Sequence, residues 1–69
     1  MTLKIINLTE REIEVLRLVC RGYTNKRIAK KLYISTHTVK AHISSIMYKL
    51  KAKNRTEAVY NALKQFIIE

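Results

Sequence analysis

Apolar residues recur at spacings of three and four in four stretches of this chain, with polar residues between the stretches. That spacing places side chains on one face of an α-helix. It predicts four helices, at about residues 10–21, 25–32, 36–51 and 55–67. The chain has one Gly and no Pro, so it carries little of the turn chemistry that sheet proteins need. We therefore predict an all-α, four-helix domain over residues 9–69, after an N-terminal arm at residues 1–8.

Capping residues mark the ends of the predicted helices. Thr9 and Glu12 have the spacing of a capping box, in which each side chain bonds the backbone N–H of the other residue. Gly22, the only glycine, stands where a left-handed residue ends a helix. The other predicted N-caps are Thr24, Ser35 and Asn54, the last with Glu57 as its capping-box partner. About three residues separate the second helix from the third, and so short a link forces the large crossing angle of a helix-turn-helix motif.

The charge of the chain is strongly positive and unevenly distributed. Fourteen Lys and Arg residues oppose five Glu residues, and there is no Asp. From Val15 to Thr56 the chain has eleven basic residues and no acidic one. A charge that served only solubility would not require acids to be absent over so long a segment. The distribution therefore favours a polyanion as the partner.

The predicted helix at 36–51 has two contrasting faces. Val39, Ile43, Ile46 and Leu50 fall within a stripe roughly 60° wide. The opposite face carries small or hydrogen-bonding side chains and no acid, as expected of a helix that lies in a groove of nucleic acid. The candidate base contacts are Lys40, Ala41, Ser44, His37 and Ser45. The candidate contacts to the nucleic-acid backbone are Thr24, Asn25, Thr36, Thr38, His42, Lys49 and Arg55.

Catalytic and metal-binding functions find little support in the sequence. No carboxylate stands beside a His or Cys in a pattern typical of an active site, so we do not expect an enzyme. His37 and His42 are five residues apart, about 140° around a helix, so they cannot share a metal ion. Cys20 stands alone and is best explained as a structural thiol in a reducing compartment. We therefore predict no metal and no cofactor.

No apolar run approaches the roughly 18 residues that a membrane span needs, and no signal peptide is evident. We therefore expect a cytoplasmic protein with no membrane partner. Two alternatives to DNA binding stay open. One is a basic RNA-binding or ribosome-associated module. The weaker one is a cationic peptide on a membrane surface, which would need apolar faces that the core already uses.

Four motifs stand in an order and spacing that one known family shares: Leu8-Thr9-x-Arg11-Glu12-x-x-Val15-Leu16, Gly22-x-x-Asn25-Lys26-x-Ile28-Ala29, Ile34-Ser35-x-x-Thr38-Val39-Lys40-x-His42-Ile43 and Asn54-Arg55-Thr56-Glu57-Ala58-Val59. With these motifs, the chain resembles the LuxR/GerE-type helix-turn-helix DNA-binding domain from about Leu8 to Ile67. Each motif alone is weak, whereas the combined spacing is specific.

The resemblance implies a sequence-specific transcription regulator that binds double-stranded DNA with its third helix in the major groove. Carried over by position, the base contacts fall on Lys40, Ala41 and Ser44. The resemblance also implies a homodimer formed through the fourth helix, and it makes RNA polymerase a candidate partner. The apolar residues that we expect at the dimer interface are Tyr60, Leu63 and Ile67.

Two positions depart from the family pattern. Arg27 stands where the family usually has Glu, which removes a capping box and adds positive charge near the DNA backbone. Lys51 stands where many members have Gly, so a left-handed backbone there would cost about 1 kcal/mol unless the third helix extends instead. Members are often the output half of a longer regulator. This chain is thus expected to be either a free-standing regulator of the GerE sort or the effector domain of a response regulator.

Overall fold

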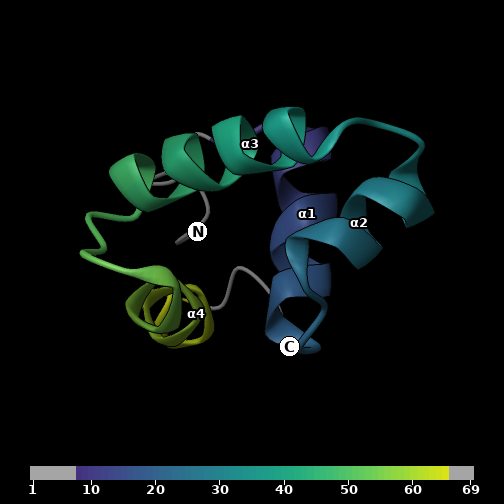
Figure 1. Cartoon of the computed structure of the whole chain (residues 1–69). Helices are drawn as coiled ribbons and strands as arrows, with labels where there is room; N and C mark the ends of the chain where they lie inside the picture. Colours follow the sequence, from purple (N-terminus) through teal and green to yellow (C-terminus); the bar gives the residue numbers. More distant parts are fainter. Residues whose placement is uncertain (1–7, 66–69) are drawn as a thin grey trace.

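The computed structural model describes residues 8–65 of the chain and consists there of four α-helices with no strand. The helices are α1 (Glu10–Cys20), α2 (Asn25–Leu32), α3 (Thr36–Lys49) and α4 (Arg55–Lys64), as Figure 1 shows. The all-α, four-helix prediction is confirmed. α3 ends two residues earlier than predicted. Ile67, which the sequence places in the fourth helix, lies outside the described residues.

Each helix begins at a polar side chain that accepts the backbone N–H three residues on, which satisfies one of the unpaired donors at a helix N-terminus. The caps are Thr9, Thr24, Ser35 and Asn54, and they accept from Glu12, Arg27, Thr38 and Glu57 at 3.1, 3.2, 3.0 and 2.8 Å. α1 has the complete capping box, because the Thr9 N–H donates to Glu12 Oε1 at 2.9 Å. α4 differs from prediction. The Glu57 carboxylate accepts the N–H of Lys53 at 2.6 Å instead of that of the cap residue.

Three helices end in one and the same backbone motif. Gly22, Tyr33 and Lys51 follow α1, α2 and α3 with φ values of +87°, +58° and +56°. The next N–H donates back into the helix each time: Tyr23 to Leu18, Ile34 to Ala29 and Ala52 to Met47, at 3.1, 3.0 and 2.9 Å. This is the Schellman motif. A left-handed conformation costs a non-glycine residue about 1–2 kcal/mol, so Tyr33 and Lys51 are strained where Gly22 is not.

The residue after each left-handed position explains why the motif is kept. Tyr23, Ile34 and Ala52 are partly buried and pack against the core. A Schellman ending commonly carries such an apolar contact, which turns the chain back onto its own helix. Lys51 is therefore left-handed because Ala52 has to reach the core, and the expected alternative, a longer third helix, is wrong.

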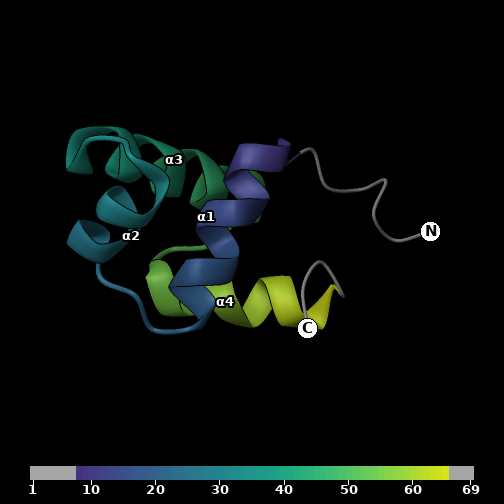
Figure 2. The same ribbon diagram turned by 90° about the vertical axis from the view of Figure 1, so that its right-hand side faces the viewer.

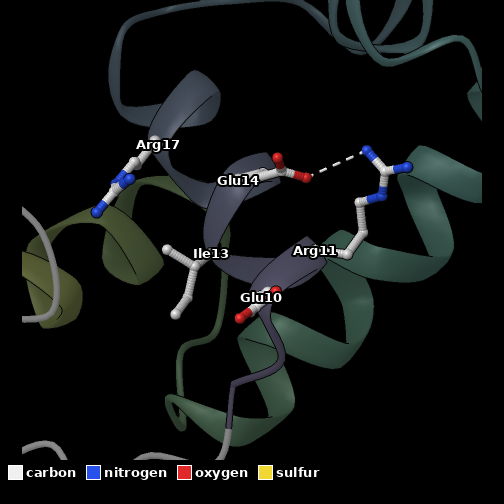
Figure 3. A pocket seen from close by; sticks show the side chains of 5 residues that line it. All are labelled: Glu10, Arg11, Ile13, Glu14 and Arg17. Atoms are coloured by element: carbon white, nitrogen blue, oxygen red, sulfur yellow. Dashed lines mark hydrogen bonds and ion pairs between the residues drawn. The ribbon is translucent and has the colours of Figure 1, made fainter.

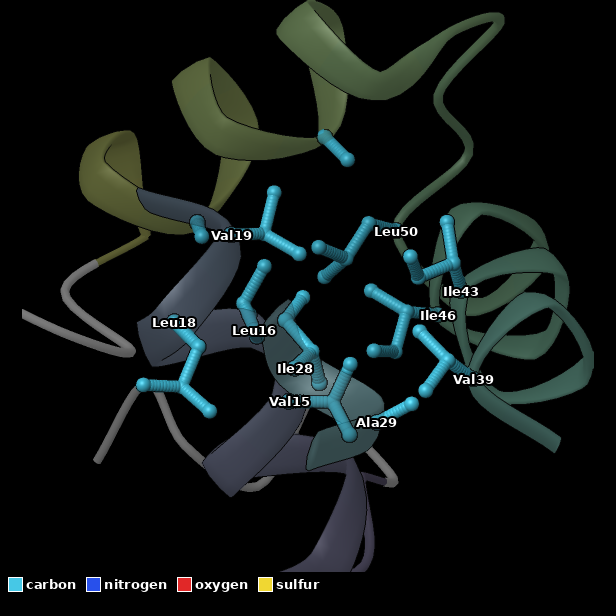
Figure 4. Packing of buried hydrophobic residues seen from close by; sticks show 12 residues of the cluster. Val15, Leu16, Leu18, Val19, Ile28, Ala29, Val39, Ile43, Ile46 and Leu50 are labelled. Carbon is cyan, nitrogen blue, oxygen red and sulfur yellow. The ribbon is translucent and has the colours of Figure 1, made fainter. Parts of the chain in front are cut away.

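The core lies between α1 and α3, which contact each other and both remaining helices (Figures 1 and 2). The predicted stripe of α3 is buried: Val39, Ile43, Ile46 and Leu50 are at most 8% exposed. Figure 4 shows these side chains meeting those of α1 and α2. The other buried apolar residues are Val15, Leu16, Leu18, Val19, Ile28, Ala29, Ala58 and Ala62. The packing leaves the opposite face of α3 at the surface.

Two apolar residues of α1, Ile13 and Cys20, are only half-buried. Ile13 lines a pocket on the outer side of α1, and Cys20 lies at the edge of the core. Burial raises the pKa of the Cys20 thiol above its ordinary value of 9.0, which fits a structural rather than a reactive role. Within residues 8–65, no helix is long and apolar enough to cross a membrane.

Candidate nucleic-acid interface

The outward face of α3 carries most of the predicted base contacts. His37, Lys40, Ala41 and Ser44 are all exposed. Tyr48, one turn beyond Ser44, is 85% exposed and extends the same face toward the end of the helix. No acidic residue occurs in α3, so hydrogen-bond donors and small groups dominate the surface that this helix presents.

Ser45 and Lys49 do not join that face, because both bind Glu12 of α1. The Ser45 hydroxyl donates to Glu12 Oε2 at 2.7 Å. The Lys49 amine donates to Glu12 Oε1 at 2.9 Å. Ser45 was expected to contact a base, but its hydroxyl is used inside the domain. Lys49 was expected to contact the DNA backbone and is tied to a carboxylate, with its side chain 28% exposed.

Glu12 is the one buried charged residue of the described chain, at 5% exposure. Burial raises its pKa, but the hydrogen bonds from Lys49, from the Thr9 backbone and from Ser45 together lower the pKa by more than burial raises it. The pKa of Glu12 therefore lies below its ordinary value of 4.5. From the sequence, capping was the only role expected of Glu12. A second signal was present, because Glu12 lies four and seven residues before Leu16 and Val19, on the buried face of α1.

The N-terminus of α2 holds a second group of predicted contacts. Thr24 is exposed and caps the helix, and Asn25 follows it. Asn25 Oδ1 accepts a hydrogen bond from the Arg55 guanidinium at 2.5 Å, and Arg55 also donates to the Tyr23 carbonyl at 2.8 Å. Because the side-chain oxygen of Asn25 is taken, the amide group left for an outside partner is a donor. The structure thus brings Asn25 and Arg55 together, although they are 30 residues apart.

The remaining residues that were predicted to contact the DNA backbone lie on α3. Thr36 is exposed in its first turn, and His42 is half-buried at its side. Thr38 is half-buried, and its hydroxyl lies 2.9 Å from that of the cap residue Ser35. One of the two hydroxyls is therefore the donor in this contact, and both remain near the helix N-terminus, where backbone N–H groups attract anions.

The outer face of α2 is basic throughout. Lys26, Arg27, Lys30 and Lys31 are exposed, and the first turn of α2 has no acidic residue. The Arg27 guanidinium lies 4.2 Å from the centre of the Tyr23 ring, a cation–π contact that holds it beside a shallow hollow lined by Lys30 and Lys31. Arg27, which stands where the family usually has Glu, therefore places a positive charge next to the residues predicted to contact the DNA backbone.

α4 turns apolar side chains outward. Tyr60 is 61% exposed and Leu63 is 47% exposed. The Lys64 amine lies 5.8 Å from the centre of the Tyr60 ring. These are two of the three residues expected at a dimer interface. The third, Ile67, is outside the described range.

A shallow pocket on the outer side of α1 differs from the α3 face because acidic and basic side chains line it together. It is lined by Glu10, Arg11, Ile13, Glu14 and Arg17 (Figure 3). Arg11 and Glu14 form an ion pair at 3.2 Å with both side chains largely exposed, so solvent screens it. Within residues 8–65, no three His, Cys, Asp or Glu side chains are grouped so that they could hold a metal ion.

Known proteins have sequences similar to that of this chain. Residues 6–62 match the family model described as bacterial regulatory proteins of the LuxR family. The oxygen regulatory protein NreC of Staphylococcus aureus is 48% identical over 62 residues, which are 90% of this chain and 29% of that protein. The chain therefore spans less than a third of the length of this curated relative.

Two solved structures have a similar fold. The transcription factor GerE superposes with a TM-score of 0.85 at 37% identity, over 90% of this chain and 92% of that one. The response regulator ChrA, from a heme-sensing two-component system, superposes with a TM-score of 0.87 at 44% identity, over 90% of this chain and 31% of that one. On these matches, the chain belongs to the LuxR family of bacterial regulatory proteins, a family of helix-turn-helix DNA-binding transcription regulators and not a class of enzymes.

Proposed function

We propose that this domain binds double-stranded DNA in a sequence-specific manner, with α3 in the major groove and α2 crossing the sugar–phosphate backbone. The observation that carries the proposal is the outward face of α3, which is exposed, free of acids and rich in small and donor side chains. α1 and α2 support this helix from the core side, so its outward face needs no partner within the domain.

Lys40, Ala41 and Ser44 are the base readers in this proposal, with His37 at the edge of the face. A Lys side chain can donate to guanine O6 and N7, and a small Ala allows close approach and can touch a thymine methyl group. Ser45 is withdrawn from this set, because its hydroxyl already donates to Glu12. The readers are therefore three adjacent side chains near the middle of α3.

The DNA backbone contacts in this proposal come from two helix N-termini and from α3. Thr24 and Asn25 offer donors at the start of α2, where the helix dipole favours phosphate. Thr36 and Thr38 lie in the first turn of α3, where the same argument holds, and His42 lies at the side of that helix. Lys49 is not counted among these contacts, because its charge is paired with Glu12. These contacts position the domain and carry no sequence information.

We further propose that two copies pair through α4, with Tyr60 and Leu63 at the contact. The two recognition helices would then lie about one DNA turn apart, roughly 34 Å, and read a symmetric site. The domain would act as a transcription regulator in the cytoplasm, with RNA polymerase as a candidate partner for surfaces turned away from DNA.

In vitro selection of duplexes bound by the 69-residue chain tests these points together. We expect an enriched two-fold symmetric sequence, and an affinity that falls steeply as salt rises. Repeating the selection with Lys40→Ala should relax the preference at one base position of each half-site, at a cost of about 1–3 kcal/mol. No enriched sequence, or stronger binding to structured RNA in competition, would contradict the proposal.

A further inference from the structure

Two residues with a strained backbone conformation lie on either side of α3. Among the described residues, Tyr33 and Lys51 are the non-glycine positions with positive φ. Tyr33 lies two residues before the cap Ser35, and Lys51 lies two residues beyond the last helical residue. Gly22 ends α1 in the same conformation, and it is the only one of the three that does not adjoin α3. The chain thus uses glycine at the distant position and larger side chains at both ends of α3.

The fold does not need these two side chains. The hydrogen bonds of both helix endings run between backbone atoms, and the core contacts come from Ile34 and Ala52. The Tyr33 side chain is 93% exposed, and Lys51 is exposed as well. Glycine would keep the same backbone with less strain. Strain that persists in a packed structure is more typical of a functional position than of a neutral one.

The length of α3 is sufficient to reach both walls of a major groove. Its 14 residues, at about 1.5 Å each, span roughly 21 Å, whereas the groove is about 12 Å wide. A helix of this length that lies at an angle across the groove can therefore reach the sugar–phosphate backbone near both ends. A phenolic O–H and an ammonium group are suitable donors to phosphate oxygens.

The charges around both positions favour phosphate. Lys30 and Lys31 precede Tyr33 in the last turn of α2, and both are exposed. Lys53 is exposed close to Lys51. No acid occurs from Val15 to Thr56. The acid nearest to Lys51 in the sequence is Glu57, whose carboxylate already accepts the Lys53 N–H at 2.6 Å. The lysines around these two positions would repel a basic partner.

We propose that Tyr33 and Lys51 bind DNA phosphates on the two walls of the major groove and so fix how α3 lies between them. The inference rests on the proposed function, because it requires α3 to enter the groove. It adds two contacts that come from the strained ends of the helix rather than from its polar face. One of them, Lys51, occupies a position where this chain departs from its family.

The test compares affinity and stability in the same variants of the 69-residue chain. Affinity for the selected duplex is measured by fluorescence anisotropy at several salt concentrations, and the unfolding midpoint of the free protein by circular dichroism. Tyr33→Gly and Lys51→Gly should keep or raise the midpoint temperature and weaken binding about three- to tenfold each, as expected for a lost phosphate contact. Lys51→Gly should also reduce the salt slope by about 0.9, the value for one lost phosphate contact.

Matched variants separate the contributions. Tyr33→Phe should reproduce most of the affinity loss, because the hydroxyl is the donor. Lys51→Arg should retain the wild-type salt slope, because it keeps the charge. Arg17→Gln removes an exposed charge on the outer side of α1 and should leave affinity within twofold of wild type.

Three outcomes would overturn the inference. The first is wild-type affinity in both glycine variants while Lys40→Ala still weakens binding, which leaves the proposed function standing. The second is an affinity loss that only follows a lower midpoint temperature, since that indicates a structural role. The third is a lack of sequence-selective binding by the wild type, which overturns the proposed function as well.

Discussion

The Lys49 amine and the Glu12 carboxylate lie 2.9 Å apart, and this ion pair joins the last turn of α3 to the first turn of α1. Glu12 also accepts hydrogen bonds from Ser45 and from the Thr9 backbone, at 2.7 and 2.9 Å. One carboxylate therefore caps α1 and anchors α3 at two points. The position of α3 on the core depends on charge as well as on apolar packing.

Replacing Glu12 by Gln should destabilise the fold. The amide group has one acceptor oxygen, so it cannot receive Thr9, Ser45 and Lys49 together, and Lys49 loses its counter-charge. We expect a loss of about 1–3 kcal/mol in the free energy of unfolding, measured in urea. Glu14→Gln is the matched control, because its ion pair with Arg11 is largely exposed, and it should change stability by less than about 0.5 kcal/mol. Equal effects of the two variants would contradict this role of Glu12.

Acid should weaken the Glu12 anchor. The pKa of Glu12 is lower in the fold than its ordinary value of 4.5, so the unfolded chain binds a proton at a higher pH than the folded chain does. Stability from this group is therefore present above pH 4.5 and is lost as pH falls through the folded pKa. The difference in unfolding free energy between wild type and Glu12→Gln should shrink in urea titrations below pH 4.5. A difference that grows on acidification would reverse the assigned direction.

The adjacent serines of α3 should behave in opposite ways. Ser45→Ala removes a donor to Glu12 and should cost about 1 kcal/mol of stability, without changing which bases the domain prefers. Ser44→Ala should leave stability unchanged, because Ser44 is exposed, and should weaken binding to the selected duplex. Urea unfolding and anisotropy titrations measure the two effects. A change in base preference in Ser45→Ala would restore Ser45 as a reader.

Asn25 and Arg55 should act on DNA as one unit. If Arg55 serves mainly to hold the Asn25 oxygen and so directs its amide outward, removing either residue loses the same contact. In a double-mutant cycle, Asn25→Ala and Arg55→Ala should therefore be clearly less than additive in their effect on DNA affinity. Additive losses would instead indicate that Arg55 meets the DNA backbone independently. Unfolding curves of the same variants correct for loss of the bond to the Tyr23 carbonyl.

Leu63→Glu should prevent pairing without unfolding the domain. Leu63 is 47% exposed, so a charge there costs little in the monomer and much at an apolar interface. Sedimentation of the protein with a two-half-site duplex should show two copies bound for wild type and one for the variant. Thr56→Ala, at an exposed position near the other end of α4, serves as control. Two copies of Leu63→Glu on that duplex would exclude α4 as the dimer contact.

Local pattern predicted the parts of the structure that depend on near neighbours in the chain. The stripe from Val39 to Leu50 follows from helical period, and the cap at Thr9 from residues three apart. The bonds of Glu12 to Ser45 and Lys49 join residues 33 and 37 positions apart, and periodicity shows burial but not the partner. Ser45 was placed on the polar face for this reason. The Arg55 bond to Asn25 was missed in the same way.

Backbone conformation at helix ends was predictable only where glycine marked it. Gly22 indicated a left-handed ending, and the structure has one there. Tyr33 gave no such signal. Lys51 left two outcomes open, a left-handed residue or a longer third helix. Both are decided by tertiary packing, because the following residues, Ile34 and Ala52, must reach the core. Packing of this kind overrides residue preference and is not visible in a local window.

In the absence of DNA, α3 is already held along its length by four of its own apolar side chains in the core and by its bonds to Glu12. A segment that folds on binding buries a large additional surface and shows a strongly negative heat capacity change. A helix that is already ordered avoids this, so the heat capacity change of association should reflect the interface alone. Substitutions in the readers would then act mainly on the rate of dissociation, since the encounter needs no conformational change.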